Sequence, residues 1–494
     1  MKEKILTLAA LLLMGAGQFS YAQKDKYTAL KNIKAHVDFG ETIRTMDFTQ
    51  HSFGIGGVNP MPMPQKVVEG VGKLKPNMIR IFIQEFFFIE KENRTLDFSA
   101  LDKYMRAVNA TGADVMASIC IKSPSLYPKV DETIWRPTDV KRWQYIIGEM
   151  VKRYSVDNKY VTHWGVGNEI NIGEWGGCPY LIKDVKDYFE YYKMTVAPIL
   201  KAYPGAKVGG PSWAGTGEDG YRFFDEFIGL CKKEKIQLDF VSYNIYSANP
   251  ESHIRGALRF KSSVDKHDSK IEIYITELNV DLGGVAIEER AYIPKRAAGL
   301  GAILHEYYKR APFLKTFQYH IYDQFCDPNQ FKPFFARHRY MANHWNDEPH
   351  RLGLFDMDGR PRPQYFMYSM LYAMAKNEVP AKVDDYDNVR ILASHDDRYV
   401  TLFLTNYHPE TTDNITLSLY FKNAQQGTAR LTVYRIDDNM NWDNDHFKLI
   451  PTETRMVYVH DDFWFSLFVP EDSVVMVVLD YDEKLVSLCR NFQI

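Results

Sequence analysis

The sequence is poor in cysteine and contains no pattern that would bind a metal. Five cysteines are scattered over 494 residues, without a Cys-x-x-Cys pair. An odd, sparse set of this kind makes no disulfide framework and does not resemble a zinc site. We expect free buried thiols, with a bridge between Cys178 and Cys326 as the alternative. We therefore predict no metal and no other cofactor.

Clusters of one charge and long apolar stretches are also missing. The formal net charge is −3 without a basic run, so the composition offers no case for nucleic-acid binding. The apolar run Ile5 to Met14 is too short to span a membrane. Because it follows Lys2 and Lys4 and precedes a small-x-small motif ending at Ala22, it is typical of a signal peptide. We predict that residues 1–22 are cleaved, that the protein is exported to the periplasm or the cell exterior, and that it does not insert into a membrane.

Short β-rich runs alternate with helical patterns from about residue 52 to 375. The eight runs are HSFGIGG, MIRIFI, DVMASICI, VTHWGVG, KVGGP, DFVSYNIY, IEIYITE and TFQYHIY. One intervening helical segment, Phe98 to Ala110, is followed by Gly112, as a helix end should be. Eight strands that alternate with helices over about 300 residues predict a (β/α)8 barrel, which we place at residues 51–375.

The pattern changes after Lys376. Strand-like runs follow one another without intervening helices, which predicts an antiparallel β-sandwich over residues 376–494. The segment Lys34 to Asp47, upstream of the barrel, is also extended. We expect residues 23–50 to join this sandwich. No low-complexity linker separates the two modules, so we expect them to pack rigidly. The sequence leaves the oligomeric state open.

Two glutamates stand where a barrel of this kind places its chemistry. The C-terminal ends of the barrel strands face the mouth of the active site. Glu169 follows the fourth predicted strand and Glu277 ends the seventh, so 277 − 169 = 108 residues separate them, about three βα units. One carboxyl could protonate the leaving oxygen of a glycosidic bond while the other attacks the anomeric carbon. The pair therefore predicts hydrolysis of glycosides.

The order of several motifs resembles a family of retaining glycosidases. In chain order they are LDFSALD, WRPTDVKRW, RYS, WGVGNEIN, KVGGP, LDFVSYNIY, YITELN, LGLFDMDGRPRPQYF, LTVYRIDD and PEDSVVMVVL. With its acid/base on strand four and its nucleophile on strand seven, the chain is most similar to glycoside hydrolase family 39, a family of β-xylosidases and α-L-iduronidase. The resemblance implies that Glu169 is the general acid/base and that Glu277 is the nucleophile of a double displacement.

The same resemblance implies a set of substrate-binding residues. Asn168 is expected to hydrogen-bond the sugar 2-hydroxyl, Tyr246 to donate to the nucleophile, and Arg80 to hold the nucleophile ionised. The alternatives are a core tyrosine for Tyr246 and a structural ion pair for Arg80. The other residues expected at the substrate are Asn244, Tyr319 and Trp175.

Four positions depart from the family pattern. Ile170 stands where proline usually follows the Asn-Glu pair, and Tyr319 replaces a tryptophan at the end of strand eight. Phe82 and Asn244 occupy the places of two sugar-binding histidines of the family β-xylosidases. The catalytic pair is intact, so these changes bear on the sugar pocket.

A β-xyloside is the first choice of substrate on resemblance alone. The enzyme is expected to cleave terminal sugars from plant or host polysaccharide fragments. Exo action is expected because the aromatic and basic stretch Cys326 to Pro349 is long enough to wall off one side of the mouth. The alternatives are a β-galactoside, an arabinofuranoside or a uronide, which would need a cation such as Lys122, Arg337 or Arg339. A non-catalytic carbohydrate-binding protein is disfavoured by the complete catalytic set.

Gly165 and Gly167 lie in the fourth predicted strand, just before Glu169. We expect these glycines to let neighbouring aromatic side chains crowd the strand end. Such an apolar lining raises the pKa of a carboxyl by disfavouring its charged form, which would keep Glu169 protonated as a general acid. Glu277, with tyrosine and arginine donors, is expected to stay ionised.

Overall fold

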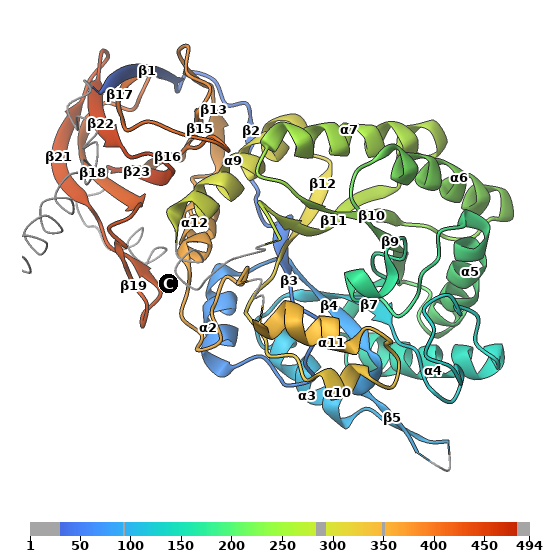
Figure 1. Ribbon diagram of the computed structural model, residues 1–494. Coiled ribbons are helices and arrows are strands. Elements are labelled where there is room, and N and C mark those ends of the chain that lie inside the picture. The colour runs from blue at the N-terminus through green and yellow to red at the C-terminus, as the bar shows by residue number, and fades with distance from the viewer. Residues whose placement is uncertain (1–29, 92–93, 283–292, 348–350, 482–494) are drawn as a thin grey trace, which may run out of the picture.

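The described part of the chain forms a closed barrel and a pair of packed β-sheets, as the computed structural model in Figure 1 shows. The structure describes residues 30–91, 94–282, 293–347 and 351–481. The predicted signal peptide lies outside the described residues, as does Cys489. Within the described ranges, no helix has both the length and the apolar composition that crossing a bilayer requires.

Eight strands close the barrel in the chain order that the sequence predicts. They are β3 (His51–Gly54), β4 (Met78–Gln84), β7 (Asp114–Cys120), β8 (Val161–Val166), β9 (Lys207–Ala214), β10 (Phe240–Tyr246), β11 (Glu272–Asn279) and β12 (Leu314–Tyr319). Neighbouring strands are parallel, including β12 and β3, whose pairing closes the ring. The predicted (β/α)8 fold is confirmed.

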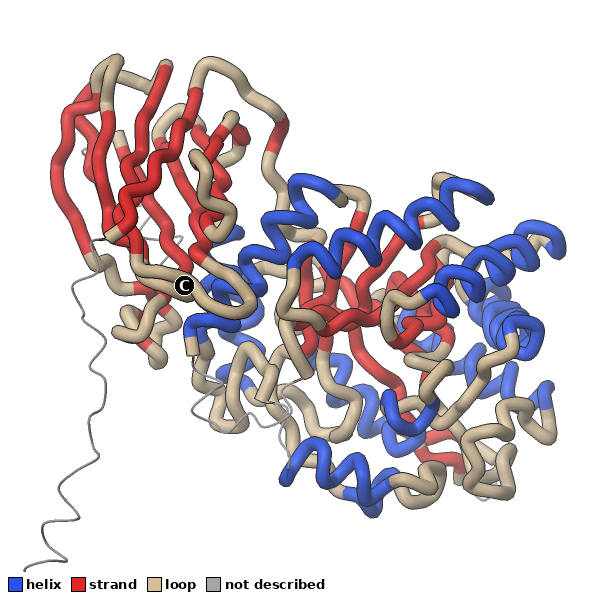
Figure 2. The backbone as a smooth tube through the Cα atoms, turned by 45° about the horizontal axis from the view of Figure 1, so that its top comes forward, coloured by secondary structure: helices blue, strands red, loops and turns tan. Residues whose placement is uncertain are grey.

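Helices surround the barrel strands, as Figure 2 shows. The α-helices within the described residues are α2 (Gln65–Leu74), α3 (Ser99–Asn109), α4 (Val140–Val151), α5 (Val185–Ala202), α6 (Glu218–Glu234), α7 (Pro250–His267), α9 (Pro294–Arg310), α10 (Pro328–Phe331), α11 (His338–Ala342) and α12 (Pro363–Tyr372). Tighter or wider turns are η1 (Glu85–Phe87), η2 (Lys152–Asp157), η3 (Gly173–Gly176) and η4 (Asn343–Asp347). The carboxylates of Asp139 and Asp184 cap α4 and α5 by accepting backbone N–H groups that a helix start leaves unpaired.

Two further sheets pack face to face beside the barrel. The larger has the order β2-β13-β15-β16-β23-β18-β21 and the smaller β14-β1-β17-β22. Their bounds are β1 (Lys31–Asp38), β2 (Arg44–Thr45), β13 (Asn377–Val379), β14 (Ala381–Val383), β15 (Val389–His395), β16 (Tyr399–Asn406), β17 (Ile415–Lys422), β18 (Gly427–Ile436), β21 (Glu453–Val459), β22 (Trp464–Val469) and β23 (Ser473–Asp480). Two short hairpins are β5 (Ile89–Glu90) with β6 (Leu96–Asp97) and β19 (Trp442–Asp443) with β20 (Lys448–Leu449). Inward residues of both sheets form one apolar core, so the predicted sandwich is confirmed.

The strand upstream of the barrel, β1, lies in the smaller sheet. It pairs antiparallel with β14 and parallel with β17, so a strand from before the barrel and strands from after it share one sheet. The sandwich meets the barrel across α9 and α12 (Figure 1). There the buried carboxylate of Glu378 accepts hydrogen bonds from Arg44 (2.7 Å) and Lys309 (2.7 Å). A buried, multiply paired carboxylate joins the two modules with defined geometry.

The described cysteines are all unbridged. Cys120, Cys178, Cys231 and Cys326 are free, buried thiols. The expectation of free buried thiols is confirmed for these four residues, and the alternative bridge between Cys178 and Cys326 is wrong.

Candidate active site

A cavity of about 420 Å³ opens at the C-terminal ends of the barrel strands. Six of the eight residues expected in the site line it: Glu169, Glu277, Asn244, Tyr246, Tyr319 and Trp175. The other two, Arg80 and Asn168, lie buried behind the carboxyls and contact them or their neighbours. Within the described residues, no cluster of three His, Cys, Asp or Glu side chains has an arrangement that could hold a metal ion.

Glu277 lies on β11 and receives a donor on each carboxyl oxygen. The Tyr246 hydroxyl donates to Oε2 at 2.6 Å, and Arg80 Nη1 donates to Oε1 at 3.0 Å. Arg80 lies on β4, is fully buried and forms an ion pair with Glu277. This attraction is strong because the protein interior screens charges less than water does. Donors on both oxygens stabilise the carboxylate form, the form that a nucleophile needs.

Glu169 follows β8 and has the opposite electrostatic surroundings. Its carboxyl is partly accessible from the cavity, but the surrounding protein removes most of its water. This burial, together with the negative charge of Glu277, raises the pKa of Glu169 well above its usual range. A hydrogen bond from Asn244 and the charge of Arg80 oppose that rise without cancelling it. Glu169 therefore suits the protonated form, as a general acid requires.

The backbone around Glu169 is unusual. Glu169 has a φ of +44°, in the left-handed region, and its N–H donates to Ser212 O at 2.8 Å. Gly167 has a φ of +83°, which glycine adopts without steric cost. A non-glycine residue in this region is strained and persists where surrounding bonds hold it, often at functional sites.

The glycines have a different role from the one expected. A Cβ on Gly165 would press on Ser118 Oγ at 3.1 Å, and one on Gly167 on Ile170 at 2.9 Å. Their crowding neighbours are therefore not aromatic, and that expectation is wrong. The sequence reasoning also missed Gly176, where a Cβ would collide with the carboxyl of Glu169. Gly176 leaves the space that this side chain occupies.

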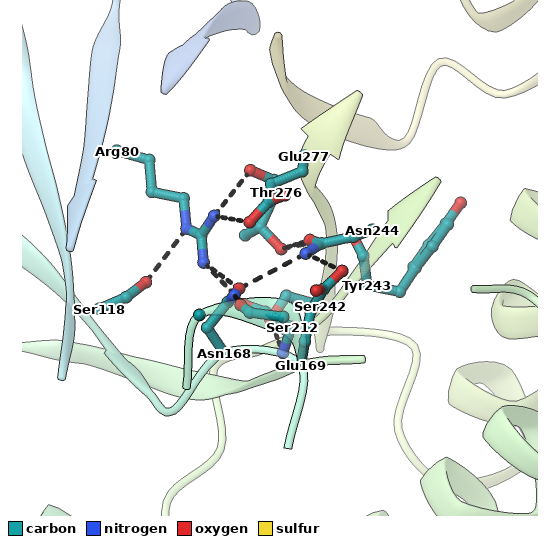
Figure 3. A network of polar contacts seen from close by, with 12 residues as sticks. Arg80, Ser118, Asn168, Glu169, Ser212, Ser242, Tyr243, Asn244, Thr276 and Glu277 are labelled. Carbon is teal, nitrogen blue, oxygen red and sulfur yellow. Dashed lines mark hydrogen bonds and ion pairs between the residues drawn. The ribbon is translucent and has the colours of Figure 1, made fainter. Parts of the chain in front are cut away.

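A chain of polar contacts links the two carboxyls (Figure 3). Arg80 Nη2 donates to Asn168 Oδ1 at 2.7 Å, and Asn168 Nδ2 donates to Gly176 O at 2.8 Å. Asn244 Nδ2 donates to Glu169 Oε1 at 2.9 Å. The sequence reasoning missed the hydroxyls that complete this network: Ser118, Ser212, Ser242 and Thr276. A hydroxyl at an inward position of a barrel strand is the signal that could have identified them.

Aromatic side chains form the rim of the cavity. Trp175, 52% exposed, meets Tyr340 edge-on with ring centroids 4.6 Å apart. The guanidinium of Arg337 lies over the Trp175 ring at 4.9 Å from its centroid. Deeper in the cavity, Tyr319 packs edge-on against Phe82 at 6.4 Å. Exposed ring faces beside buried polar groups are typical of a surface that holds a sugar.

Residues 326–347, here called the strap, cross one side of the mouth and supply Tyr340, Met341, His344 and Trp345 to the cavity wall. Asn346 closes the strap by bonding both the N–H and the C=O of Cys326. Glu174, fully buried, anchors it by accepting the N–H groups of Ala336 (2.9 Å) and Arg337 (2.7 Å). Burial raises the pKa of Glu174 although these two donors oppose the rise.

Replacing Glu174 by glutamine should loosen the strap. The new NH2 group would face a backbone N–H, so one hydrogen bond is lost and two donors are opposed. We expect a loss of about 1–3 kcal/mol of stability, faster amide hydrogen exchange in residues 326–347 and a raised KM. Glu190→Gln, at an exposed ion pair with Lys193, is the control and should change none of these. Unchanged exchange in the strap of Glu174→Gln would contradict the anchoring role.

Comparisons with known proteins agree with this geometry. Residues 119–443 match the sequence profile of glycosyl hydrolases family 39. A curated relative, the beta-xylosidase of Geobacillus stearothermophilus, is 23% identical over an alignment of 137 residues that covers 25% of this chain and 26% of that protein. The match thus spans about a quarter of that relative's length.

Solved structures share the fold along nearly the whole chain. A monomeric beta-xylosidase from Caulobacter crescentus superposes with a TM-score of 0.68 at 16% identity, covering 91% of this chain and 99% of that one. A GH39 enzyme from Xanthomonas axonopodis pv. citri superposes with a TM-score of 0.68 at 18% identity, covering 92% and 98%. At such identities the likeness shows the fold alone, while the profile match covers more than half of the sequence. The chain belongs to glycosyl hydrolases family 39.

Proposed function

We propose that this protein is an exo-acting glycoside hydrolase that works by double displacement with retention of configuration. The observation that carries the proposal is the contrast between two carboxyls in one cavity. Glu277 receives donors from Tyr246 and Arg80, whereas burial and the charge of Glu277 raise the pKa of Glu169. Environments that favour opposite protonation states assign the nucleophile and the acid.

The reaction follows from this arrangement. The Glu277 carboxylate attacks the anomeric carbon while Glu169 gives its proton to the glycosidic oxygen, so the C–O bond breaks and a glycosyl ester of Glu277 forms. Glu169, now ionised, then takes a proton from a water molecule whose oxygen attacks the same carbon. The ester bond breaks, the sugar leaves and both carboxyls return to their starting states.

The cavity supports a neutral sugar. Among its described lining residues there is no lysine or arginine. Lys122 donates to the carbonyls of Asp131 (2.6 Å) and Pro179 (3.1 Å), and Arg337 pairs with Glu132 at 2.5 Å. Two of the cations considered for a uronide are thus engaged elsewhere, and Arg339 is not among the lining residues. Among the described lining residues, a charged uronide would find no cationic partner for its desolvated carboxylate.

A β-xyloside remains the first choice of substrate. The curated relative and the Caulobacter structure are both named as beta-xylosidases. Phe82 presents a ring at a place where a family xylosidase presents an imidazole, so xyloside turnover is expected to be modest. A β-galactoside or an arabinofuranoside is the alternative, and nitrophenyl glycosides of all three sugars, with a glucuronide as the control, would rank them. Exo action is supported by the strap, which closes one side of the mouth.

Hydrolysis is expected to retain the anomeric configuration, because two successive inversions restore it. Proton NMR during turnover of a nitrophenyl β-glycoside should show the β-anomer of the free sugar first, with the α-anomer appearing later by mutarotation. An α-anomer as first product would show inversion and overturn the double displacement.

Export is also part of the proposal, and N-terminal sequencing of the mature protein would check cleavage after residue 22.

A further inference from the structure

We propose that Asn244 is a positioning residue that holds the carboxyl of the acid/base, and not a residue that binds the sugar. The inference rests on the proposed function, in which Glu169 is the acid/base. It also differs from the sequence-based expectation that Asn244 binds the substrate.

The side-chain amide of Asn244 directs its hydrogen-bonding groups toward protein atoms (Figure 3). Its Nδ2 lies 2.9 Å from Glu169 Oε1 and 3.4 Å from Asn168 Oδ1. Its Oδ1 accepts from the Thr276 hydroxyl at 2.7 Å. A side-chain amide has two N–H protons, and here each has a protein oxygen before it. No donor of Asn244 is left for a sugar hydroxyl.

The orientation of this amide follows from Arg80. Because a guanidinium has only donors, the Asn168 atom 2.7 Å from Arg80 Nη2 must be the amide oxygen. That oxygen also faces Asn244, so Asn244 must present its NH2 group there. A flipped Asn244 would set two carbonyl oxygens against each other. Arg80 thus determines, through Asn168, that Asn244 donates to Glu169.

The backbone of β10 aims Asn244 at the acid/base. The pairing of β10 with β11 shifts register between Tyr243 and Asn244, and its pairing with β9 shifts one residue earlier. Tyr243 packs outward against Phe260 of α7, with ring centroids 4.4 Å apart. The extra residues lie in the neighbouring strands, Thr276 in β11 and Ser212 in β9, while β10 keeps its alternation of inward and outward side chains. Asn244 accordingly turns inward toward the end of β8.

Several charged or titratable groups act on Glu169 from the surrounding elements. Glu277 on β11 and Cys178 after β8 raise its pKa, and Arg80 on β4 lowers it. Tyr246 on β10 is partly buried and Tyr319 on β12 is buried; the pKa values of both phenols are raised, so they stay neutral. The hydrogen bond from Asn244 favours the ionised carboxyl. Its loss should therefore raise the pKa of Glu169 further.

The test is a titration of Glu169 in Asn244→Ala. Glutamate labelled with 13C at the δ-carboxyl would be followed by NMR across pH, with the Glu169 signal assigned by its loss in Glu169→Gln. We expect its pKa to rise by about one unit, which is tenfold in the ionisation constant. The basic limb of kcat/KM should move up by the same amount, because the acid must be protonated. Asn244→Asp, which adds a negative charge, should move both the pKa of Glu169 and the basic limb of kcat/KM further up.

The control is Asn171→Ala. Asn171 lies two residues after Glu169 and bonds the backbone of Ala214, without a contact to the carboxyl. Its loss should leave the pKa of Glu169 within about 0.3 unit. An equally small shift in Asn244→Ala, with KM raised several-fold, would overturn the proposal in favour of sugar binding. If the unaltered enzyme cleaved no glycoside, the proposed function would fail, yet the titration would still decide this contact, because it needs no substrate.

Discussion

Glu277→Ala is expected to lose turnover of every glycoside, with kcat falling about 10⁴- to 10⁶-fold, the scale for removal of a catalytic nucleophile. Without this carboxylate there is no acceptor for the glycosyl group, and no leaving group is good enough to replace it. Tyr246 and Arg80 would then donate to water or to a bound anion. Initial rates on nitrophenyl and unactivated disaccharide substrates would measure the loss.

Glu169→Ala should behave differently, and the contrast tests the two roles together. Substrates with good leaving groups need little protonation, so their turnover should survive better than that of a disaccharide. Azide, added to the space left by the carboxyl, should intercept the glycosyl ester of Glu277 and give a glycosyl azide of retained configuration. If this variant is equally inactive on both kinds of substrate and azide rescues neither, the assignment of roles is wrong.

Arg80→Met is expected to be the most destabilising single change in the site. Arg80 is fully buried and donates to Glu277, Asn168, Ser118 and the Thr276 carbonyl. Removing one partner of a buried ion pair leaves the other charge uncompensated, which costs about 3–5 kcal/mol. Glu277 would also lose the donor to its Oε1, so kcat should fall as well.

Urea unfolding would measure the first effect, with an unchanged m-value showing that stability itself has changed. Arg222→Met is the matched control, because Arg222 and Glu218 form an exposed pair at 3.4 Å, and it should cost less than about 0.5 kcal/mol. The double variant Arg80→Met/Glu277→Gln removes both charges and should recover part of the loss. A single Arg80→Met variant as stable as the control would contradict the buried ion pair.

Much of the site was predictable because barrel chemistry lies at one end of the strands. Glu169 follows β8 and Glu277 lies near the end of β11, and two such positions in a closed parallel barrel must face the same mouth. The contacts of Tyr246 and Arg80 with Glu277 were implied by the family resemblance and not by this rule, since Arg80 lies near the start of β4. The hydroxyl groups that bond Asn244 and Arg80 from neighbouring strands were harder to foresee. Thr276 and Ser118 look like ordinary strand residues until the inward face of each strand is known.

The glycines show where local interpretation fails. A Gly-x-Gly at a strand end signals crowding or a left-handed turn, but it does not say which atoms approach. Gly165 faces Ser118, Gly167 takes a positive φ, and the glycine that makes room for the Glu169 side chain is Gly176, in η3. The anchor of the strap also escapes local interpretation, because Glu174 accepts the N–H of Arg337, 163 residues further along the chain.

The sequence by itself determined the alternation of strands and helices, the change to an all-β pattern after Lys376 and the two glutamates at strand ends, because hydrophobic period and strand length are local properties. Only the tertiary structure decided which donor meets which oxygen. Asn244 and Glu169 are 75 residues apart in sequence, and their contact depends on how β10 pairs with the strands beside it and on an amide orientation that Arg80 imposes. Hydrogen bonds require atoms placed to within tenths of an ångström, and that placement exists only once the barrel has closed.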